Sequence, residues 1–123
     1  MPRSYPYISI GGSPAPAVKI TVRSGDRRDE EIALLDSGAN ATAISARIVS
    51  SLGLQQLGEH RVSSTIGTES LRPFFVMDLD FLGRRYRNHP VFLSDRTYVI
   101  IGRDILNQHR ITLDGPKLRF SIK

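Results

Sequence analysis

The sequence contains no cysteine and only three histidines. The lack of cysteine excludes disulfide bonds, thiolate metal sites and cysteine nucleophiles. No apolar run approaches the ~20 residues that span a bilayer, and the first residues lead into no signal-like segment. We therefore expect a cytoplasmic protein with no membrane partner. The same observations also fit a chain that is part of a larger precursor.

The sequence also has few candidate metal ligands. His60, His89 and His109 are each isolated, with no spacing typical of a metal site. Asp78 and Asp80 form a D-x-D pair that could bind a metal, but no convincing third ligand lies near them in the sequence. A better explanation than a metal site is that both carboxylates lie on the solvent-facing side of a strand. We expect no metal and no cofactor.

The length of 123 residues predicts a single domain over residues 1–123. The formal net charge of +5 raises the question of nucleic-acid binding. The basic residues are scattered along the chain, however, whereas a nucleic-acid binder usually clusters them on one face. Aromatic residues do not alternate with a basic face either. We therefore expect no nucleic-acid partner.

Short alternating segments dominate the chain and predict an all-β, barrel-like fold. Residues 1–16 indicate an N-terminal arm with one short strand, and residues 17–23 and 30–35 two strands of a hairpin. Residues 60–75 favour a hairpin with Gly67 near its tip. The remaining expected strands cover 74–82, 86–93, 98–101 and two stretches around the Asp-Gly-Pro turn at 114–116. Pro90 suggests an edge or a break in its strand.

Helical signals are few. Apolar residues at helical spacing between 44 and 54 allow a short helix or a turn, and residues 103–109 predict a short helix near the C-terminal end. The expected fold class is therefore a barrel with one short C-terminal helix.

The stretch Ile32–Ala43 carries the clearest chemical signal. Four apolar residues deliver Asp36, Ser37 and Gly38 into a sharp turn, and small residues follow. An apolar run bounded in this way is typical of a buried strand. A carboxylate at its end is costly unless it is paired or hydrogen-bonded. An ordinary Asx turn would use the same residue types, so the motif alone leaves both interpretations open.

The flanking residues resemble a known family. Residues 33–39, read as A-L-L-D-S-G-A, resemble the catalytic loop of the retroviral-type, or retropepsin-like, aspartic proteases, whose signature is Asp-Thr/Ser-Gly-Ala. Residues 99–106, read as V-I-I-G-R-D-I-L, resemble the second fingerprint of that family. The two matches occur in the right order and at about the right separation. The resemblance implies the acid-protease barrel with a flap hairpin, here at about 60–75, and an aspartic endopeptidase that hydrolyses extended, largely apolar peptides.

The resemblance also assigns roles by position. Asp36, Ser37 and Gly38 correspond to the catalytic loop. Residues corresponding to substrate-binding positions are Leu34, Ala39, Asn40, Ala43, Ile66, Gly67, Tyr98 and Ile100. Gly102, Arg103 and Asp104 correspond to structural support of that loop. Since Asn40 replaces an aspartate of many viral members, we expect Arg103 to turn to Asp104 or another carboxylate.

Peptide hydrolysis without a metal or a covalent intermediate needs an activated water and a protonated leaving group, and two carboxylates that share one proton supply both. The chain has one Asp-Ser/Thr-Gly sequence, and Asp114 lacks the hydroxyl neighbour. An enzyme of this kind therefore requires a two-fold homodimer in which Asp36 of each chain meets its copy. The alternative is a non-catalytic peptide-binding or dimerisation module of the same fold. Longer termini than those of the viral enzymes leave the terminal-strand interface open.

Overall fold

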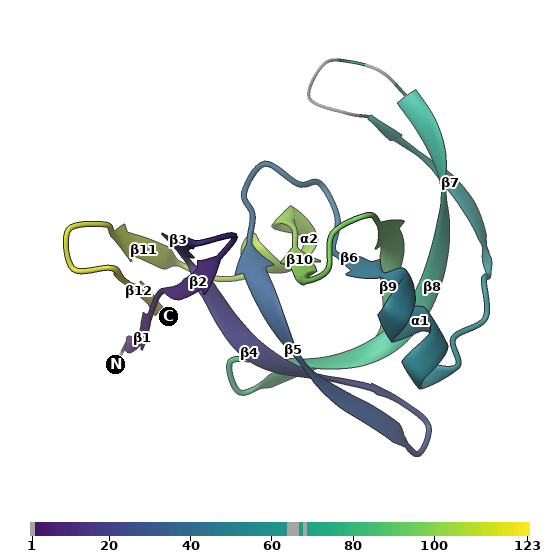
Figure 1. Cartoon of the computed structure of the whole chain (residues 1–123), viewed down its shortest axis with the longest axis horizontal. Helices are drawn as coiled ribbons and strands as arrows, with labels where there is room; N and C mark the ends of the chain where they lie inside the picture. The colour runs from purple at the N-terminus through teal and green to yellow at the C-terminus, as the bar shows by residue number, and fades with distance from the viewer. Residues whose placement is uncertain (1, 64–66, 68) are drawn as a thin grey trace.

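A computed structural model describes residues 2–63, 67 and 69–123. Its elements are mostly short strands, joined by tight turns (Figure 1). In chain order the elements are β1 (Arg3–Pro6), β2 (Ile8–Ile10), β3 (Ser13–Ala15), β4 (Ala17–Ser24), β5 (Arg27–Leu35), β6 (Ala43–Ser45), α1 (Ala46–Leu52), β7 (Gly58–Ser63), β8 (Glu69–Phe81), β9 (Arg84–Ser94), β10 (Val99–Ile101), α2 (Arg103–Leu106), β11 (Ile111–Asp114) and β12 (Arg119–Ile122).

The main sheet closes on itself. Its strand order is β4-β5-β10-β6-β9-β8-β7, and β4 also pairs with β8, so that six strands form a ring with β7 added outside it. Most neighbouring strands are antiparallel, but the pairs β5–β10 and β6–β9 are parallel. The predicted all-β barrel is confirmed. Closure leaves few strand edges, which explains how such short strands stay paired.

The barrel interior is filled by the alternating apolar residues of its long strands. On β8, Phe75, Met77, Leu79 and Phe81 are all buried, as their spacing of two predicts. The intervening Asp80 faces outward and pairs with arginines of β4 and β9. The expected strands at 17–23, 30–35, 74–82, 86–93 and 98–101 are thus all present.

The strand around Pro90 has a neighbour on one side only. Pro90 pairs with Val76 of β8, whereas β6 joins β9 only further along, from Phe92 onward. The missing N–H of proline therefore removes no bond to a second neighbour. The predicted edge position is confirmed for this part of β9.

The described residues contain two helices, so the prediction of a single C-terminal helix is incomplete. The stretch at 44–54, left open between helix and turn, contains α1, which begins after the Ser45 cap and ends at the left-handed Gly53. Arg47 of α1 makes a salt bridge with buried Glu31 of β5, with Nη1 and Oε2 3.0 Å apart. At the other end of the chain, α2 stops at Leu106 and a turn continues to His109.

The predicted hairpin at 60–75 is formed by β7 and the first half of β8. Gly58 to Ser63 pair with Phe74 to Glu69 in antiparallel register. The hairpin extends beyond the barrel and curves over it (Figure 1). Gly67 has a positive φ of 82°, as a glycine in a tight turn allows. Ile66, expected at the tip, lies outside the described residues.

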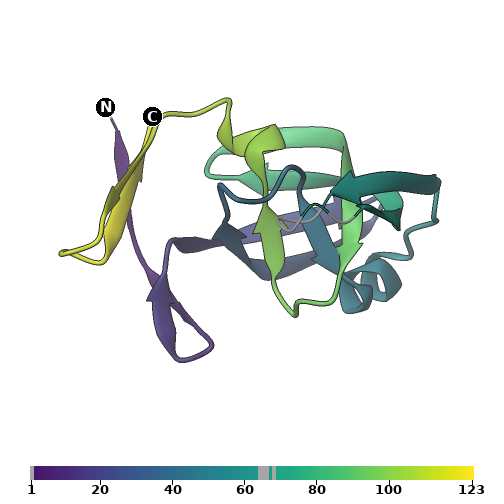
Figure 2. The ribbon, with the colours of Figure 1, turned by 90° about the horizontal axis from the view of Figure 1, so that it is seen from above.

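The N-terminal arm differs from its prediction of one short strand. It contains three strands: β1 pairs with β12 at the opposite end of the chain, and β2 and β3 pair with each other. Together β1, β12 and β11 form a separate antiparallel sheet, and β2 and β3 a small hairpin. Figure 2 shows the terminal sheet standing apart from the barrel, with both chain ends on it.

Candidate active site

Asp36 is delivered to the site by the strand that precedes it. β5 pairs in parallel with β10, with Leu34 opposite Ile100. The backbone N–H of Asp36 then donates to the carbonyl of Ile101 at 2.9 Å, which continues the pairing by one residue. The Asp36 backbone is thus held by the same pairing with β10 as β5. Asp36 is also the first residue of the loop at 36–42.

The Asp-Ser-Gly turn is closed around the carboxylate. The N–H of Gly38 donates to Oδ1 of Asp36 at 2.9 Å, and the N–H of Ala39 donates to the Asp36 carbonyl at 3.1 Å. A Cβ at position 38 would lie 3.2 Å from Oδ1, so a side chain there would crowd the carboxylate. Within the described chain, Oδ2 of Asp36 accepts no hydrogen bond. The turn therefore orients the carboxylate and leaves one oxygen for another partner.

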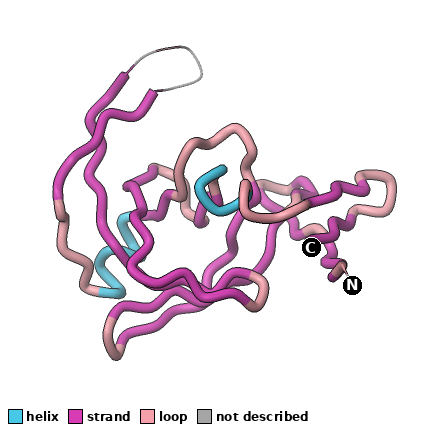
Figure 3. Tube along the Cα trace, turned by 180° about the vertical axis from the view of Figure 1, so that it is seen from behind, coloured by secondary structure: helices cyan, strands magenta, loops and turns pink. Residues whose placement is uncertain are grey.

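Arg103, from α2, braces this loop. Its backbone N–H donates to Ala39 O at 2.9 Å, its Nη1 to Ser37 O at 2.7 Å, and its Nη2 to Oδ1 of Asn40. Figure 3 shows the loop passing beside the short helix. The expectation that Arg103 turns to a carboxylate is wrong, because the amide oxygen of Asn40 and the carbonyl of Ser37 supply the acceptors. This places the arginine where the resemblance implied.

A second set of hydrogen bonds lies beneath the loop and centres on Asp104. Its two carboxylate oxygens accept from Thr42, from Oγ1 at 2.9 Å and from the backbone N–H at 3.0 Å. His89 Nε2 lies 2.8 Å from Asp104 Oδ2. Because an ionised carboxylate can only accept, the histidine nitrogen is the donor. One side chain of α2 thus joins the loop to β9.

The pKa of Asp104 reflects these contacts. Burial favours the neutral acid and by itself would raise the value. The hydrogen bonds from His89 and Thr42 outweigh burial, and the pKa of Asp104 lies below its ordinary value. Asp104 is therefore ionised near neutral pH, which suits a structural acceptor.

A groove opens in front of Asp36, between the loop at 36–42 and the base of the β7–β8 hairpin. Its volume is about 280 Å³. The residues that line it are Asp36, Gly38, Ala39, Asn40, Ala41, Ala43, Ser70, Arg72, Phe92, Leu93, Ser94, Asp95, Arg96 and Ile100. The lining of the groove combines apolar residues with the Asp36 carboxylate and further charged residues.

The structure brings together part of the predicted substrate-binding set. Four of its members line the groove with Asp36 and Gly38: Ala39, Asn40, Ala43 and Ile100. Leu34 and Gly67 do not line it. Tyr98 lines a different cavity, beside Glu31 and Arg47. Of the supporting residues, Gly102, Arg103 and Asp104 all contact the loop.

Sequence reasoning missed one wall of the groove. Ser70 and Arg72 stand two residues apart on β8, and residues 92–96 come from the end of β9 and the turn after it; Ala41 of the loop was missed as well. The alternation of Ser70 and Arg72 was a usable signal, since residues two apart share a strand face. That this face borders the Asp36 loop depends on the β6–β9 pairing, which the sequence does not display.

Neither a metal cluster nor a membrane-spanning helix occurs in the part of the chain that the structure describes. No group of three or more histidine or acidic side chains is arranged to hold a metal ion there. None of the helices over the described ranges is long and apolar enough to cross a membrane.

A closed barrel, a hairpin curving over it and an Asp-Ser-Gly turn at a strand end define a retropepsin-like fold. Solved structures agree. The chain is similar to a retropepsin-like aspartic protease from Rickettsia conorii, with a TM-score of 0.64, 11% identity and coverage of 99% of this chain and 91% of that one. It is also similar to the EIAV protease in complex with an inhibitor, with a TM-score of 0.62, 16% identity and coverage of 82% and 93%.

A third similar structure is the simian foamy virus protease, with a TM-score of 0.57, 14% identity and coverage of 74% and 91%. The family model described as aspartyl protease matches residues 9–105, which is more than half of the chain. The chain therefore belongs to the aspartyl protease family. A comparison with curated proteins finds no match.

Proposed function

We propose that this protein is an aspartic endopeptidase whose active unit is a homodimer, with Asp36 of both chains in one site. The observation that carries the proposal is the placement of Asp36: a carboxylate on a rigid turn, with one oxygen unbonded within the described chain, at the mouth of a groove. Family membership supports peptide hydrolysis as the chemistry.

The chemistry follows from two carboxylates sharing one proton. Their closeness opposes ionisation of both, so one is charged and the other protonated. The charged one takes a proton from a water molecule, whose oxygen attacks the peptide carbonyl carbon, while the protonated one donates a hydrogen bond to the carbonyl oxygen. The C–N bond then breaks as the amide nitrogen receives a proton. Neither a metal nor a covalent intermediate is needed.

The remaining loop residues have proposed supporting roles. Gly38 keeps the approach to Asp36 clear of a side chain, and exposed Ser37 is available to hydrogen-bond across the dimer axis. Asn40 would offer backbone groups to an extended peptide, and Ala39, whose N–H and C=O are bonded to Asp36 and Arg103, would shape the groove with Ala43 and Ile100. The β7–β8 hairpin, with Gly67 near its tip, would close over the bound peptide.

Cleavage of denatured casein from acidic to neutral pH tests the proposal. We expect Asp36→Asn to reduce cleavage by at least about a hundredfold, because the variant lacks the carboxylate that activates water. Asp26→Asn, in the exposed β4–β5 turn, is the matched control and should cleave like the wild type. Circular dichroism would establish that both variants are folded.

Mixing the two forms tests the shared site. If each site needs Asp36 from two chains, an excess of Asp36→Asn captures wild-type chains in inactive dimers and suppresses their activity. Activity should also rise with the square of enzyme concentration when dimers are dilute. Equal inertness of wild type and variant at concentrations where the dimer is established would instead favour a peptide-binding module of the same fold.

A further inference from the structure

We infer that the groove beside Asp36 contains a subsite for an acidic side chain of the substrate, formed by Arg72 and Arg96. The inference rests on the proposed function, since it concerns which peptides that site prefers. It differs from the expectation of largely apolar substrates, which the motifs implied. Arg72 and Arg96 come from different parts of the chain, β8 and the turn after β9, and both line the same groove.

Arg72 and Arg96 differ from the arginines that have structural tasks. Four arginines of the described chain make salt bridges with carboxylates: Arg23, Arg47, Arg61 and Arg85. Arg72, in contrast, makes one side-chain hydrogen bond within the described residues, from Nη1 to the carbonyl of Leu93 at 3.3 Å. No side-chain hydrogen bond of Arg96 occurs within the described residues. Both side chains are exposed, and both keep N–H groups available to a ligand.

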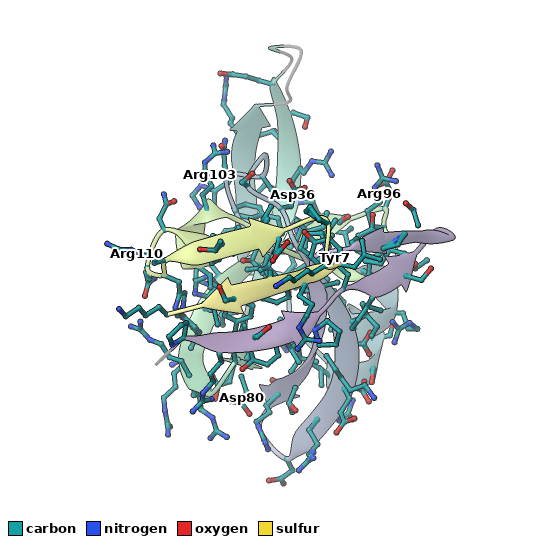
Figure 4. The ribbon with its side chains drawn as sticks, turned by 90° about the vertical axis from the view of Figure 1, so that its left-hand side faces the viewer. Tyr7, Asp36, Asp80, Arg96, Arg103 and Arg110 are labelled. Atoms are coloured by element: carbon teal, nitrogen blue, oxygen red, sulfur yellow. The ribbon has the colours of Figure 1, made fainter. Side chains whose placement is uncertain are left out.

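The carboxylates of the groove do not neutralise these arginines. Asp95 lines the groove too, but within the described chain it forms no salt bridge with either arginine. Asp36 is turned toward the N–H of Gly38. In Figure 4, Asp36 lies between Arg103 and Arg96. Arg103 is already bonded to the loop through Ser37 and Asn40, which leaves Arg72 and Arg96 as the cations that face a bound peptide.

The chemistry favours glutamate at this position. Phe92, Leu93 and Ile100 provide apolar surface against which its methylene groups can pack, and a guanidinium binds a carboxylate through two parallel hydrogen bonds. The shared-proton pair of aspartates is negatively charged and by itself repels an acidic peptide. Two nearby cations offset that repulsion. A two-fold dimer would repeat the subsite, so the preference should occur on both sides of the scissile bond.

The test compares peptides that differ only in charge. In a peptide cut by the wild-type enzyme, each position within four residues of the scissile bond is changed in turn to Glu or to Gln. We expect kcat/KM to be roughly three- to tenfold higher for Glu than for Gln where the side chain reaches the arginines, the scale of a partly exposed ion pair. This ratio should decline as salt is added.

Variants identify the residues responsible. The double variant Arg72→Gln, Arg96→Gln should bring the Glu-to-Gln ratio close to one while it still cleaves the Gln peptide. Arg28→Gln, an exposed arginine at the far end of β5, should keep the wild-type ratio. A ratio near one at every position of the wild type, or a ratio that survives in the double variant, would overturn the inference.

A binding measurement separates this inference from the proposed function. Fluorescence anisotropy with Asp36→Asn measures the affinity for the Glu and Gln peptides without cleavage. If no peptide is cut by the wild type but the Glu peptide binds more tightly and loses that advantage in the arginine variants, the endopeptidase fails and the acidic subsite stands. If cleavage occurs and neither assay distinguishes the peptides, the subsite fails and the endopeptidase stands.

Discussion

Gly102 lies where the loop bearing Asp36 packs closely against the segment leading into α2. A Cβ at this position would lie 2.5 Å from the carbonyl carbon of Ala41 and 2.7 Å from its oxygen. Its φ of −91° is ordinary for any residue, so the requirement for glycine comes from the close approach and not from the backbone angle. Both neighbours are backbone, which cannot move without displacing the loop.

We expect Gly102→Ala to destabilise the fold by roughly 2–3 kcal/mol, the cost of an overpacked site. Arg103 and Asp104, which bond the loop bearing Asp36, follow Gly102 directly in the sequence. The cleavage rate should therefore fall by more than the loss of folded protein explains. Gly115→Ala is the matched control: an added Cβ meets nothing within 4 Å, and its φ is not positive. Urea unfolding measures both variants. Equal unfolding free energies for the two would contradict the role given to Gly102.

At the scale of single elements, α2 is one turn of helix that connects three parts of the molecule. Asp104 joins it to Thr42 in the loop and to His89 on β9, while Arg103 joins it to Ser37 and Asn40. A helix this short has little stability of its own. Its position therefore depends on these side-chain contacts and on buried Ile105 and Leu106.

The lowered pKa of Asp104 gives a pH dependence with a definite sign. Because the native state favours the ionised form, the contribution to stability is complete above the ordinary aspartate pKa of about 4 and is lost as pH falls through the lower native value. We expect Asp104→Asn to lose roughly 1–3 kcal/mol at neutral pH, and to show a weaker fall in stability below about pH 4.

Urea unfolding at several pH values between 2 and 7 measures this difference, with Asp26→Asn as the exposed control. Some acid sensitivity should remain in Asp104→Asn, since hydrogen bonds from Arg85 and Arg23 also lower the pKa of Asp80. A wild type and an Asp104→Asn variant with parallel stability profiles would show that the Asp104 contacts contribute little.

At the scale of the whole molecule, the terminal sheet exposes large apolar side chains. Leu113 and Leu118, on or beside β11 and β12, have exposed fractions of 58% and 49%. The sheet is tied together within one chain by the pairing of β1 with β12, and it stands apart from the barrel in Figure 2. Exposed leucines on such a projecting sheet are candidates for contact with a second copy.

We therefore expect Leu113→Glu to weaken the proposed homodimer by at least about tenfold in dissociation constant, because a charge in an apolar interface is poorly solvated. Sedimentation velocity measures the equilibrium, and cleavage activity should recover at high protein concentration. Leu57→Glu is the control, since Leu57 is equally exposed at 56% but precedes β7. Dimers unaffected by Leu113→Glu would place the interface elsewhere.

Much of this molecule was predictable because its signals are local. Spacing of two identified the buried face of β8, and an apolar run ending in Asp-Ser-Gly located Asp36 at the end of β5. The Asp-Gly-Pro turn separated β11 from β12 as expected. Each of these signals depends on a few neighbouring residues. The pairing of β1 in the N-terminal arm was not predictable, because its partner β12 lies at the other end of the chain.

By itself, then, the sequence determined the class of fold, the position of Asp36 and the presence of one such motif per chain, on which the proposal of a homodimer rests. The tertiary structure decided which residues share the groove with Asp36. It placed Arg72 and Arg96 there, Tyr98 beside Arg47, and Arg103 on Ser37 and Asn40. The reason is physical: such contacts join residues far apart in the sequence, 63 positions in the Arg103–Asn40 pair, and depend on strand order and register, which no local pattern encodes.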